Sequence, residues 1–268
     1  MRALPCRRQY LKIFAMLKNI LPVCAVFIIL LAAPSQSRAE DSKSRYLIGN
    51  SLTWDTVPSG LDGDVQWHVD CGKSLPYIYE HPEQPCVKNS TLWPKALIEK
   101  KYDIVSVQSH YGATLEEDAV TISKWMKLQP KAVFVIHTGW ARSKTRAEEF
   151  ASKKVAEKME HSVAYFDALL ARLKKEHPGR DIRRTRATDL LARVASDAEA
   201  GKAPFKDVAE IYRDAIHMNV VTGRYMMHNA MRHALGQPRS AKGFEKLDPK
   251  LKEYFDSVLD SLDSLDAK

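Results

Sequence analysis

Three residues whose side chains could together activate a hydroxyl group lie far apart in the chain. Ser51 follows Gly49-Asn50 at the end of a short apolar run, and Asp214 precedes His217 by three residues near the other end. A serine becomes a nucleophile when an imidazole removes its proton, and that imidazole needs a carboxylate to orient it. The sequence therefore suggests nucleophilic catalysis, provided that the fold brings these distant residues together.

Simpler explanations exist for both ends. Gly, Asn and Ser dominate turns, so Gly49-Asn50-Ser51 is also what an ordinary turn would contain. With nine histidines and 33 acidic residues among 268, about one acidic residue three positions before a histidine is expected by chance. The spacing of Asp214 and His217 therefore carries no weight by itself, and the pair could simply cap the last helix.

The elements that would position these residues alternate between strand and helix. Apolar, β-branched runs that stop at glycine or polar residues predict strands at 46–48, 65–69, 104–107 and 133–136. Helical spacing predicts helices at 91–100, 116–128, 146–177, 188–200, 223–235 and 249–265, with a loop and one helical turn at 74–89. This alternation predicts a parallel sheet with crossover helices, and such sheets place their chemistry at the carboxyl edge of the strands. Gly49 would permit the sharp turn that leaves Ser51 at this edge.

The order of these motifs resembles the SGNH (GDSL-like) hydrolases. The resemblance spans about residues 45–236 and rests on Gly-Asn-Ser after the first strand and on Asp-x-x-His followed by Met-Asn and a glycine. It implies a flavodoxin-like, three-layer α/β/α fold with a mostly parallel sheet. It also implies ester hydrolysis through an acyl-enzyme.

The resemblance assigns roles to particular residues. Ser51 matches the nucleophile, Asp214 and His217 match the acid and the base, and Gly72 matches the glycine whose N–H joins that of Ser51 in the oxyanion hole. The third motif departs from the family, because this chain has Gln108 near the position of the usual Asn. We take Gln108 as the candidate for the side-chain donor, with His110 as its competitor.

The first 39 residues have the layout of an export signal. They contain six basic and no acidic residues, an apolar run at 20–33 and small residues at 37–39. The apolar run is short for a membrane span, which needs roughly 17–25 residues, although an uncleaved anchor is the alternative. Residues 6–12 also resemble a twin-arginine motif, so the export route, to a periplasmic or secreted location, stays open.

Removal of this segment changes the charge and defines the domain. The whole chain has a net charge of +8, but residues 40–268 have 35 basic and 33 acidic residues, a net charge of +2. Near-neutrality gives no reason to expect nucleic acid or a stable membrane association. We predict a short polar leader at 40–44 and a single domain at 45–268 that includes a C-terminal amphipathic helix; the sequence does not indicate an oligomeric state.

Two cysteines remain after residue 39, and they allow two interpretations. Cys71 and Cys86 could form a disulfide in an oxidising compartment, which would stabilise the fold by about 3 kcal/mol, or could stay free thiols. His68, Asp70 and Cys71 do not match a zinc spacing, so we expect no metal and no cofactor.

These observations predict an exported serine esterase that removes acetyl or other short acyl groups from carbohydrate. The alternative is a catalytically inactive protein of the same fold that binds extracellular glycan, as the altered third motif would allow. Trp54 and Trp67 could stack on a sugar ring, but tryptophans are more often part of the core.

Overall fold

A five-stranded parallel sheet forms the centre of the computed structural model, which describes residues 42–266. Its strands are β1 (Ser44–Gly49), β2 (Asp64–Val69), β3 (Ile104–Gln108), β4 (Val133–His137) and β5 (Ile182–Arg184). Their order is β2-β1-β3-β4-β5, and every neighbouring pair is parallel. This is the flavodoxin-like order, so the predicted fold class is confirmed.

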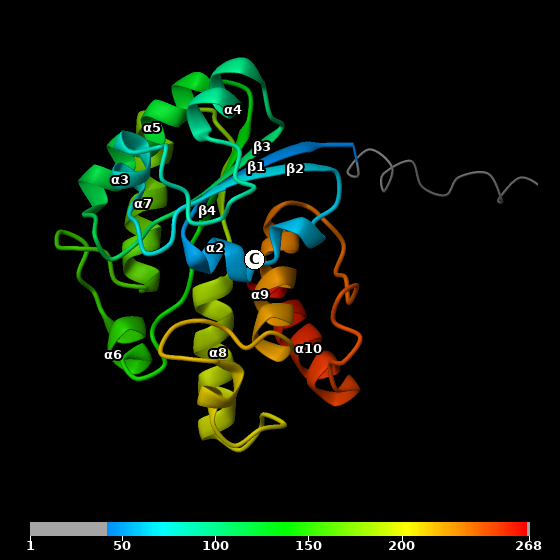
Figure 1. Ribbon diagram of the computed structural model, residues 1–268. Coiled ribbons are helices and arrows are strands. Elements are labelled where there is room, and N and C mark those ends of the chain that lie inside the picture. The colour runs from blue at the N-terminus through cyan, green and yellow to red at the C-terminus, as the bar shows by residue number, and fades with distance from the viewer. Residues whose placement is uncertain (1–41, 267–268) are drawn as a thin grey trace, which may run out of the picture. The chain divides into compact units, whose positions relative to one another are not determined.

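Helices cover both faces of the sheet and give three layers. They are α2 (Ser51–Asp55), α3 (Leu75–Glu80), α4 (Trp93–Glu99), α5 (Leu115–Leu128), α6 (Arg146–Ala151), α7 (Val163–Glu176), α8 (Ala187–Glu199), α9 (Thr222–Ala234) and α10 (Pro249–Asp266). Short 3-10 helices occupy Pro58–Gly60 and Val208–Ile211. Figure 1 shows α3, α4, α5 and α7 on one side of the strands and α8, α9 and α10 on the other.

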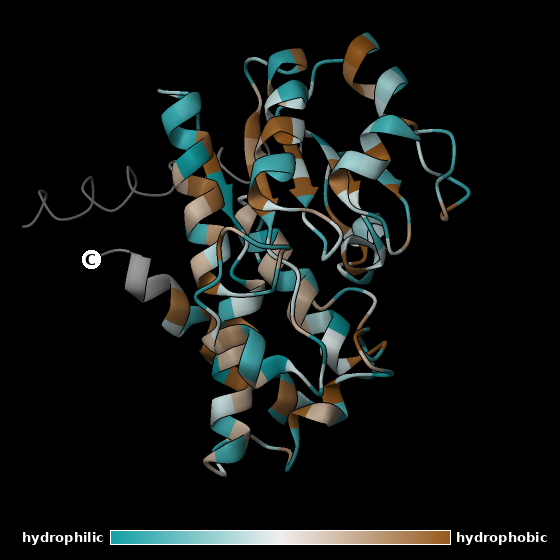
Figure 2. Cartoon of the chain, turned by 90° about the vertical axis from the view of Figure 1, so that its left-hand side faces the viewer, coloured by the Kyte–Doolittle hydropathy of each residue, from teal (hydrophilic) through white to brown (hydrophobic). Residues whose placement is uncertain are grey.

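The alternation of side chains along β1 explains these layers. Tyr46 and Ile48 pack into the core beneath α3, α4, α5 and α7, whereas Leu47 packs with Met231 and Leu235 at the end of α9. Successive strand residues point to opposite faces, so a run without polar residues fits a strand buried on both sides. The helices carry an apolar stripe, whose residues pack in the core, and a polar stripe on the opposite face (Figure 2).

Two predictions about elements were wrong, and two elements, α2 and β5, were not predicted. Residues 146–177 form α6 and α7 rather than one helix, with a non-helical segment at 152–162 between them. The edge strand β5 was not predicted, and β1 begins at Ser44, inside the predicted polar leader. The other strands and helices lie close to the predicted ranges.

The predicted export signal lies outside the described residues. Those residues all belong to one compact unit, 40–268. Between residues 42 and 266, no helix combines the length and the apolar character that crossing a bilayer requires.

Candidate active site

Close packing after β1 determines where Ser51 lies. Gly49 is the last residue of β1 and Ser51 is the first residue of α2. A Cβ atom on Gly49 would lie 2.2 Å from the hydroxyl oxygen of Thr53 and 2.8 Å from Cβ of Gln108. The glycine is therefore needed for space rather than for a positive φ, and it lets the turn fold back against β3.

The acid and the base lie on a small closed loop. An isolated antiparallel bridge joins Tyr212 to Met218, and the N–H of Arg213 donates to the carbonyl of His217 at 2.9 Å. Inside this loop, the carboxylate of Asp214 accepts the N–H groups of Ile216 at 3.0 Å and of His217 at 2.8 Å. These bonds fix the carboxylate on the same side of the loop as the imidazole.

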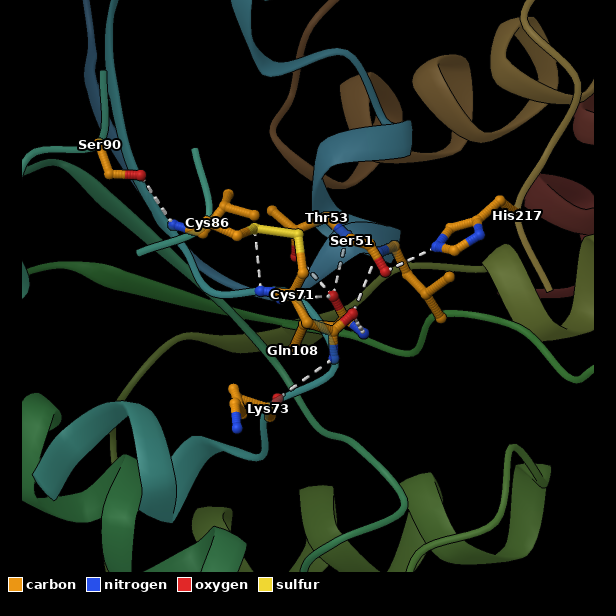
Figure 3. Close-up of a disulfide and its surroundings, with 11 residues drawn as sticks. Ser51, Thr53, Cys71, Lys73, Cys86, Ser90, Gln108 and His217 are labelled. Atoms are coloured by element: carbon orange, nitrogen blue, oxygen red, sulfur yellow. Dashed lines mark hydrogen bonds between the residues drawn. A yellow bond between two sulfur atoms is a disulfide. The ribbon is translucent and has the colours of Figure 1, made fainter. Parts of the chain in front are cut away.

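The three residues predicted to form a triad come together. His217 Nε2 lies 2.9 Å from the hydroxyl oxygen of Ser51, and His217 Nδ1 lies 2.8 Å from Asp214 Oδ2. A carboxylate only accepts hydrogen bonds, so the Nδ1 of a neutral ring carries the proton and Nε2 is left to accept from Ser51. Figure 3 shows the imidazole directed at the serine hydroxyl from a separate segment of the chain.

Hydrogen bonds keep Asp214 ionised although its environment opposes charge. Partial burial raises the pKa of Asp214, but the N–H groups of His217 and Ile216 and the imidazole lower it more, to about 2. The side chains of Asp214 and His217 are 49% and 26% exposed. The site is therefore open to solvent, and the Asp214 carboxylate is charged near neutral pH.

The segment after β4 supports the loop from one side. Trp140 donates its indole N–H to the carbonyl of Ile216 at 2.7 Å, and the N–H of Ser143 donates to Ala215 at 2.9 Å. The hydroxyl of Tyr212 donates in turn to Ala141 at 2.9 Å. Sequence reasoning missed Trp140; its position directly after the most strand-like run was the only available signal.

Two backbone N–H groups that the sequence assigns to the oxyanion hole have no acceptor between residues 42 and 266. At the start of α2, Leu52 N–H donates to Asn50 Oδ1 at 3.0 Å and Thr53 N–H to Gln108 Oε1 at 2.8 Å. The first N–H groups of a helix lack partners inside it, and here the first one, that of Ser51, has none within residues 42–266.

Gly72 offers the second free N–H group. Its neighbours are engaged, because Cys71 N–H donates to Cys86 Sγ at 3.0 Å and Lys73 N–H to Asp70 at 3.3 Å. Within the described chain Gly72 N–H has no such acceptor, and the residue is exposed. Its φ of +70° is the left-handed conformation that favours glycine.

The side chain of Gln108 does not lie as an oxyanion donor would. It is fully buried, and its Oε1 accepts from the N–H groups of Asn50 and Thr53 and from the Thr53 hydroxyl. These donors fix the amide orientation, so Nε2 donates to Asn50 Oδ1 at 3.0 Å and to the carbonyl of Ser109 at 3.3 Å. Both amide hydrogens are therefore used, which corrects our assignment: Gln108 holds the turn that carries Ser51 (Figure 3).

His110, the competing candidate, lies partly buried in the loop after β3. Burial, together with the charges of His161 and Arg142, lowers the pKa of His110 to about 4. Its ring is therefore neutral near pH 7, and a neutral imidazole keeps one N–H to donate.

The remaining sequence candidates have structural contacts. Cys71 and Cys86 form a disulfide with Cα atoms 5.6 Å apart, so the free-thiol alternative is wrong and Cys71 has no thiolate for a metal. His68 is buried, and its Nδ1 accepts the N–H of Trp93 at 3.1 Å. Trp54 packs edge-on against Trp67, with ring centroids 5.8 Å apart.

Comparison with known proteins gives distant structural likenesses only. No protein-family model matches the chain, and no curated protein matches it significantly. Among solved structures, a protein described as a GDSL-like lipase from Parabacteroides merdae is 11% identical, with 73% of this chain and 96% of that chain covered and a TM-score of 0.44. A carbohydrate esterase family 3 structure from Talaromyces cellulolyticus is 12% identical, with 76% and 100% covered and a TM-score of 0.45.

An acetyl esterase solved with an acetate ion is also 12% identical, with 80% of this chain and 99% of that chain covered and a TM-score of 0.41. Structural likeness at such low identity does not assign an activity to this chain. The evidence for an activity comes from the positions of its own side chains.

Proposed function

We propose that this protein is a serine ester hydrolase that works through Ser51, His217 and Asp214. The observation that carries the proposal is the 2.9 Å contact between His217 Nε2 and the Ser51 hydroxyl, with Asp214 bound to the other ring nitrogen. Nucleophile, base and orienting acid thus occur in the order that acyl transfer requires.

The reaction follows from these positions. His217 takes the Ser51 proton while Oγ attacks the ester carbonyl, and the N–H groups of Ser51 and Gly72 stabilise the oxyanion. The imidazolium then returns its proton to the departing alcohol oxygen, and the acyl group stays on Ser51. Water, deprotonated by His217, attacks this acyl-enzyme and releases the acid, while Asp214 stabilises the imidazolium without taking the proton. His110 is the candidate for a third oxyanion donor.

The substrate that we propose is an acetyl or other short acyl ester of carbohydrate outside the cytoplasm. The open triad supports a bulky alcohol, because Asp214 and His217 are partly exposed rather than enclosed. The disulfide between Cys71 and Cys86 supports an oxidising compartment, as does the predicted export signal at 1–39. Periplasmic or secreted location and cleavage of that signal are part of the proposal.

The test is turnover of p-nitrophenyl acetate and labelling by a fluorophosphonate. The protein should show burst acylation, and Ser51→Ala should lower kcat on the order of 10⁴-fold or more and abolish labelling. Ser59→Ala, which changes an exposed serine outside the triad, is the matched control and should keep both properties. If the folded wild-type protein shows no burst and no labelling, catalysis is rejected and the inactive glycan-binding alternative is favoured.

A further inference from the structure

A buried carboxylate links the nucleophile helix to the loop that carries the acid and the base. Asp55 is the last residue of α2, four positions after Ser51, and its side chain is 0% exposed. No pattern in the sequence around Asp55 indicates a role for it. A buried carboxylate is costly unless it is paired and hydrogen-bonded, so its partners show what it holds together.

Two of these partners flank the triad residues of the loop. Arg213, directly before Asp214, donates Nη1 to Asp55 Oδ1 at 3.0 Å and to Oδ2 at 3.2 Å. Met218, directly after His217, donates its N–H to Asp55 Oδ2 at 2.9 Å. One carboxylate therefore fixes both ends of the segment 214–217 relative to the helix that begins with Ser51.

A third partner links the same carboxylate to the helix α9. Arg224, in the first turn of α9, donates Nε at 3.0 Å and Nη2 at 2.7 Å to Asp55 Oδ1. Hydrogen bonds to charged groups are about twice as strong as neutral ones, and this carboxylate receives them from two guanidinium groups. The link thus joins α2, the 213–218 loop and α9 at one point.

The contacts after β4 do not replace this link. Trp140 and Ser143 hold Ile216 and Ala215 from the other side of the loop, and they belong to a segment that carries no triad residue. Only the contacts of Asp55 run directly from the nucleophile helix to the residues beside Asp214 and His217, among the described hydrogen bonds apart from the Ser51–His217 bond itself.

We propose that Asp55 is a positioning residue that sets the distance between Ser51 and His217. The inference rests on the proposed function, since it concerns the geometry of that same triad. A misplacement of about 1 Å can lower a rate about 10²-fold, so loss of the link should affect chemistry more than substrate binding.

The experiment compares Asp55→Asn with Asp62→Asn. Asp62 pairs with Arg232 of α9, so its substitution also removes a carboxylate–arginine link to α9 but leaves the 213–218 loop untouched. With p-nitrophenyl acetate, Asp55→Asn should lower kcat roughly 10–100-fold and change KM less than about threefold, whereas Asp62→Asn should keep kcat. Hydrogen exchange of peptides covering 212–218 should accelerate in Asp55→Asn only.

If Asp55→Asn does not fold, Arg213→Gln removes the arginine part of the link between Asp55 and the loop, from a side chain that is 35% exposed. It also removes the 3.9 Å ion pair between Arg213 and Asp214 and leaves the Met218 N–H bond to Asp55 in place. It should lower kcat and accelerate exchange at 212–218 in the same direction as Asp55→Asn. The proposal is overturned if the folded variant keeps wild-type exchange at 212–218, or if kcat falls no more than in Asp62→Asn. Absence of turnover in the wild-type protein would instead reject the hydrolase function, while the exchange measurement would still report on the link.

Discussion

At the scale of single residues, the proposed triad could be predicted because its members depend on residue type and chain order. Ser51, Asp214 and His217 are the groups that acyl transfer needs, and each follows a recognisable turn or strand end. The role of Gln108 could not be predicted, because it depends on which of its atoms face buried N–H groups. Asp55 escaped prediction for the same reason: sequence does not reveal that an acidic residue is fully buried between two arginines.

The position of Gln108 predicts that its loss affects stability as well as catalysis. In Gln108→Ala, the buried N–H groups of Asn50 and Thr53 lose their acceptor, so the free energy of unfolding should fall by about 2–5 kcal/mol. The turn before Ser51 should also loosen, so kcat should fall. Urea unfolding and ester turnover measure the two effects.

Gln129→Ala is the matched control for this prediction. Gln129 is also a buried glutamine that accepts a backbone N–H, from Tyr102, and donates to Leu97 and Lys100, but it lies at the opposite end of the strands. It should lose similar stability and keep kcat. Unchanged stability of Gln108→Ala with a kcat about 10²–10³-fold lower would instead indicate an oxyanion donor.

At the scale of elements, periodicity identified the long, regular segments. It failed where tertiary packing determines whether a segment is a helix, a strand or a loop. The buried strands and α5 were predicted because their patterns are strong. The division of 146–177 into α6 and α7 was not, since residues 152–158 are as polar as a solvated helix would be. The segment instead is non-helical and bends at 156–157, an isolated bridge joins Lys158 to Thr114, and the N–H of Met159 donates to the carbonyl of Ala113 at 2.8 Å. The strand β5 is only three residues long, too short for any alternation to show.

The contact between α5 and α7 predicts an unusual dependence of stability on pH. Asp118 of α5 is fully buried and accepts the hydroxyl of Tyr165 of α7 at 2.8 Å. Burial raises the pKa of Asp118 to about 7, although contacts with Ser109 and Tyr165 lower it. In the unfolded chain this pKa is about 3.9, so between these values the folded protein holds the extra proton. Stability should therefore fall as pH rises from about 4 to 7, by up to about 1.4 kcal/mol per pH unit from this group.

Asp118→Asn tests this sign, because it keeps the shape and an acceptor for Tyr165 but does not titrate. Urea unfolding of both proteins at several values between pH 5 and 8 should show the variant gaining stability relative to the wild type as pH rises. Glu149 does not interfere. Its pKa of about 2, which burial raises but the contacts with His161, Thr145 and Tyr111 lower more, changes stability only at more acidic pH. Parallel curves for the two proteins would show that Asp118 is ionised in the folded state.

At the scale of the whole molecule, the fold joins a nucleophile and a base that are 166 residues apart in sequence. The parallel order β2-β1-β3-β4 places the ends of β1 and β3 side by side. The proposed nucleophile follows the turn after β1, and the glutamine that holds this turn is the last residue of β3. The family resemblance predicted this arrangement, but the supporting contacts of α9 and of the segment after β4 depend on tertiary packing. Patterns within one segment contain no information about such contacts.

The disulfide makes the proposed activity depend on the compartment. It lies next to Gly72 and closes a loop between Cys71 and Cys86, so the variant Cys71→Ser/Cys86→Ser should lose about 3 kcal/mol of stability. The fold should persist, because Asp70 N–H still bonds to Gly49 and Cys86 N–H to Val69, at 2.9 and 3.0 Å. The freer loop should lower kcat if the N–H of Gly72 serves in the oxyanion hole as proposed, because the bridge fixes the residue directly before it.

Thermal unfolding and ester turnover with and without dithiothreitol check this dependence. Reduction should lower the Tm and kcat of the wild-type protein toward those of the double serine variant, which dithiothreitol should leave unchanged because residues 40–268 contain no other cysteine. A wild-type Tm that falls while kcat stays constant would mean that the position of Gly72 does not depend on the bridge. In that case its positive φ and the neighbouring bond from Lys73 to Asp70 would be enough to hold the N–H in place.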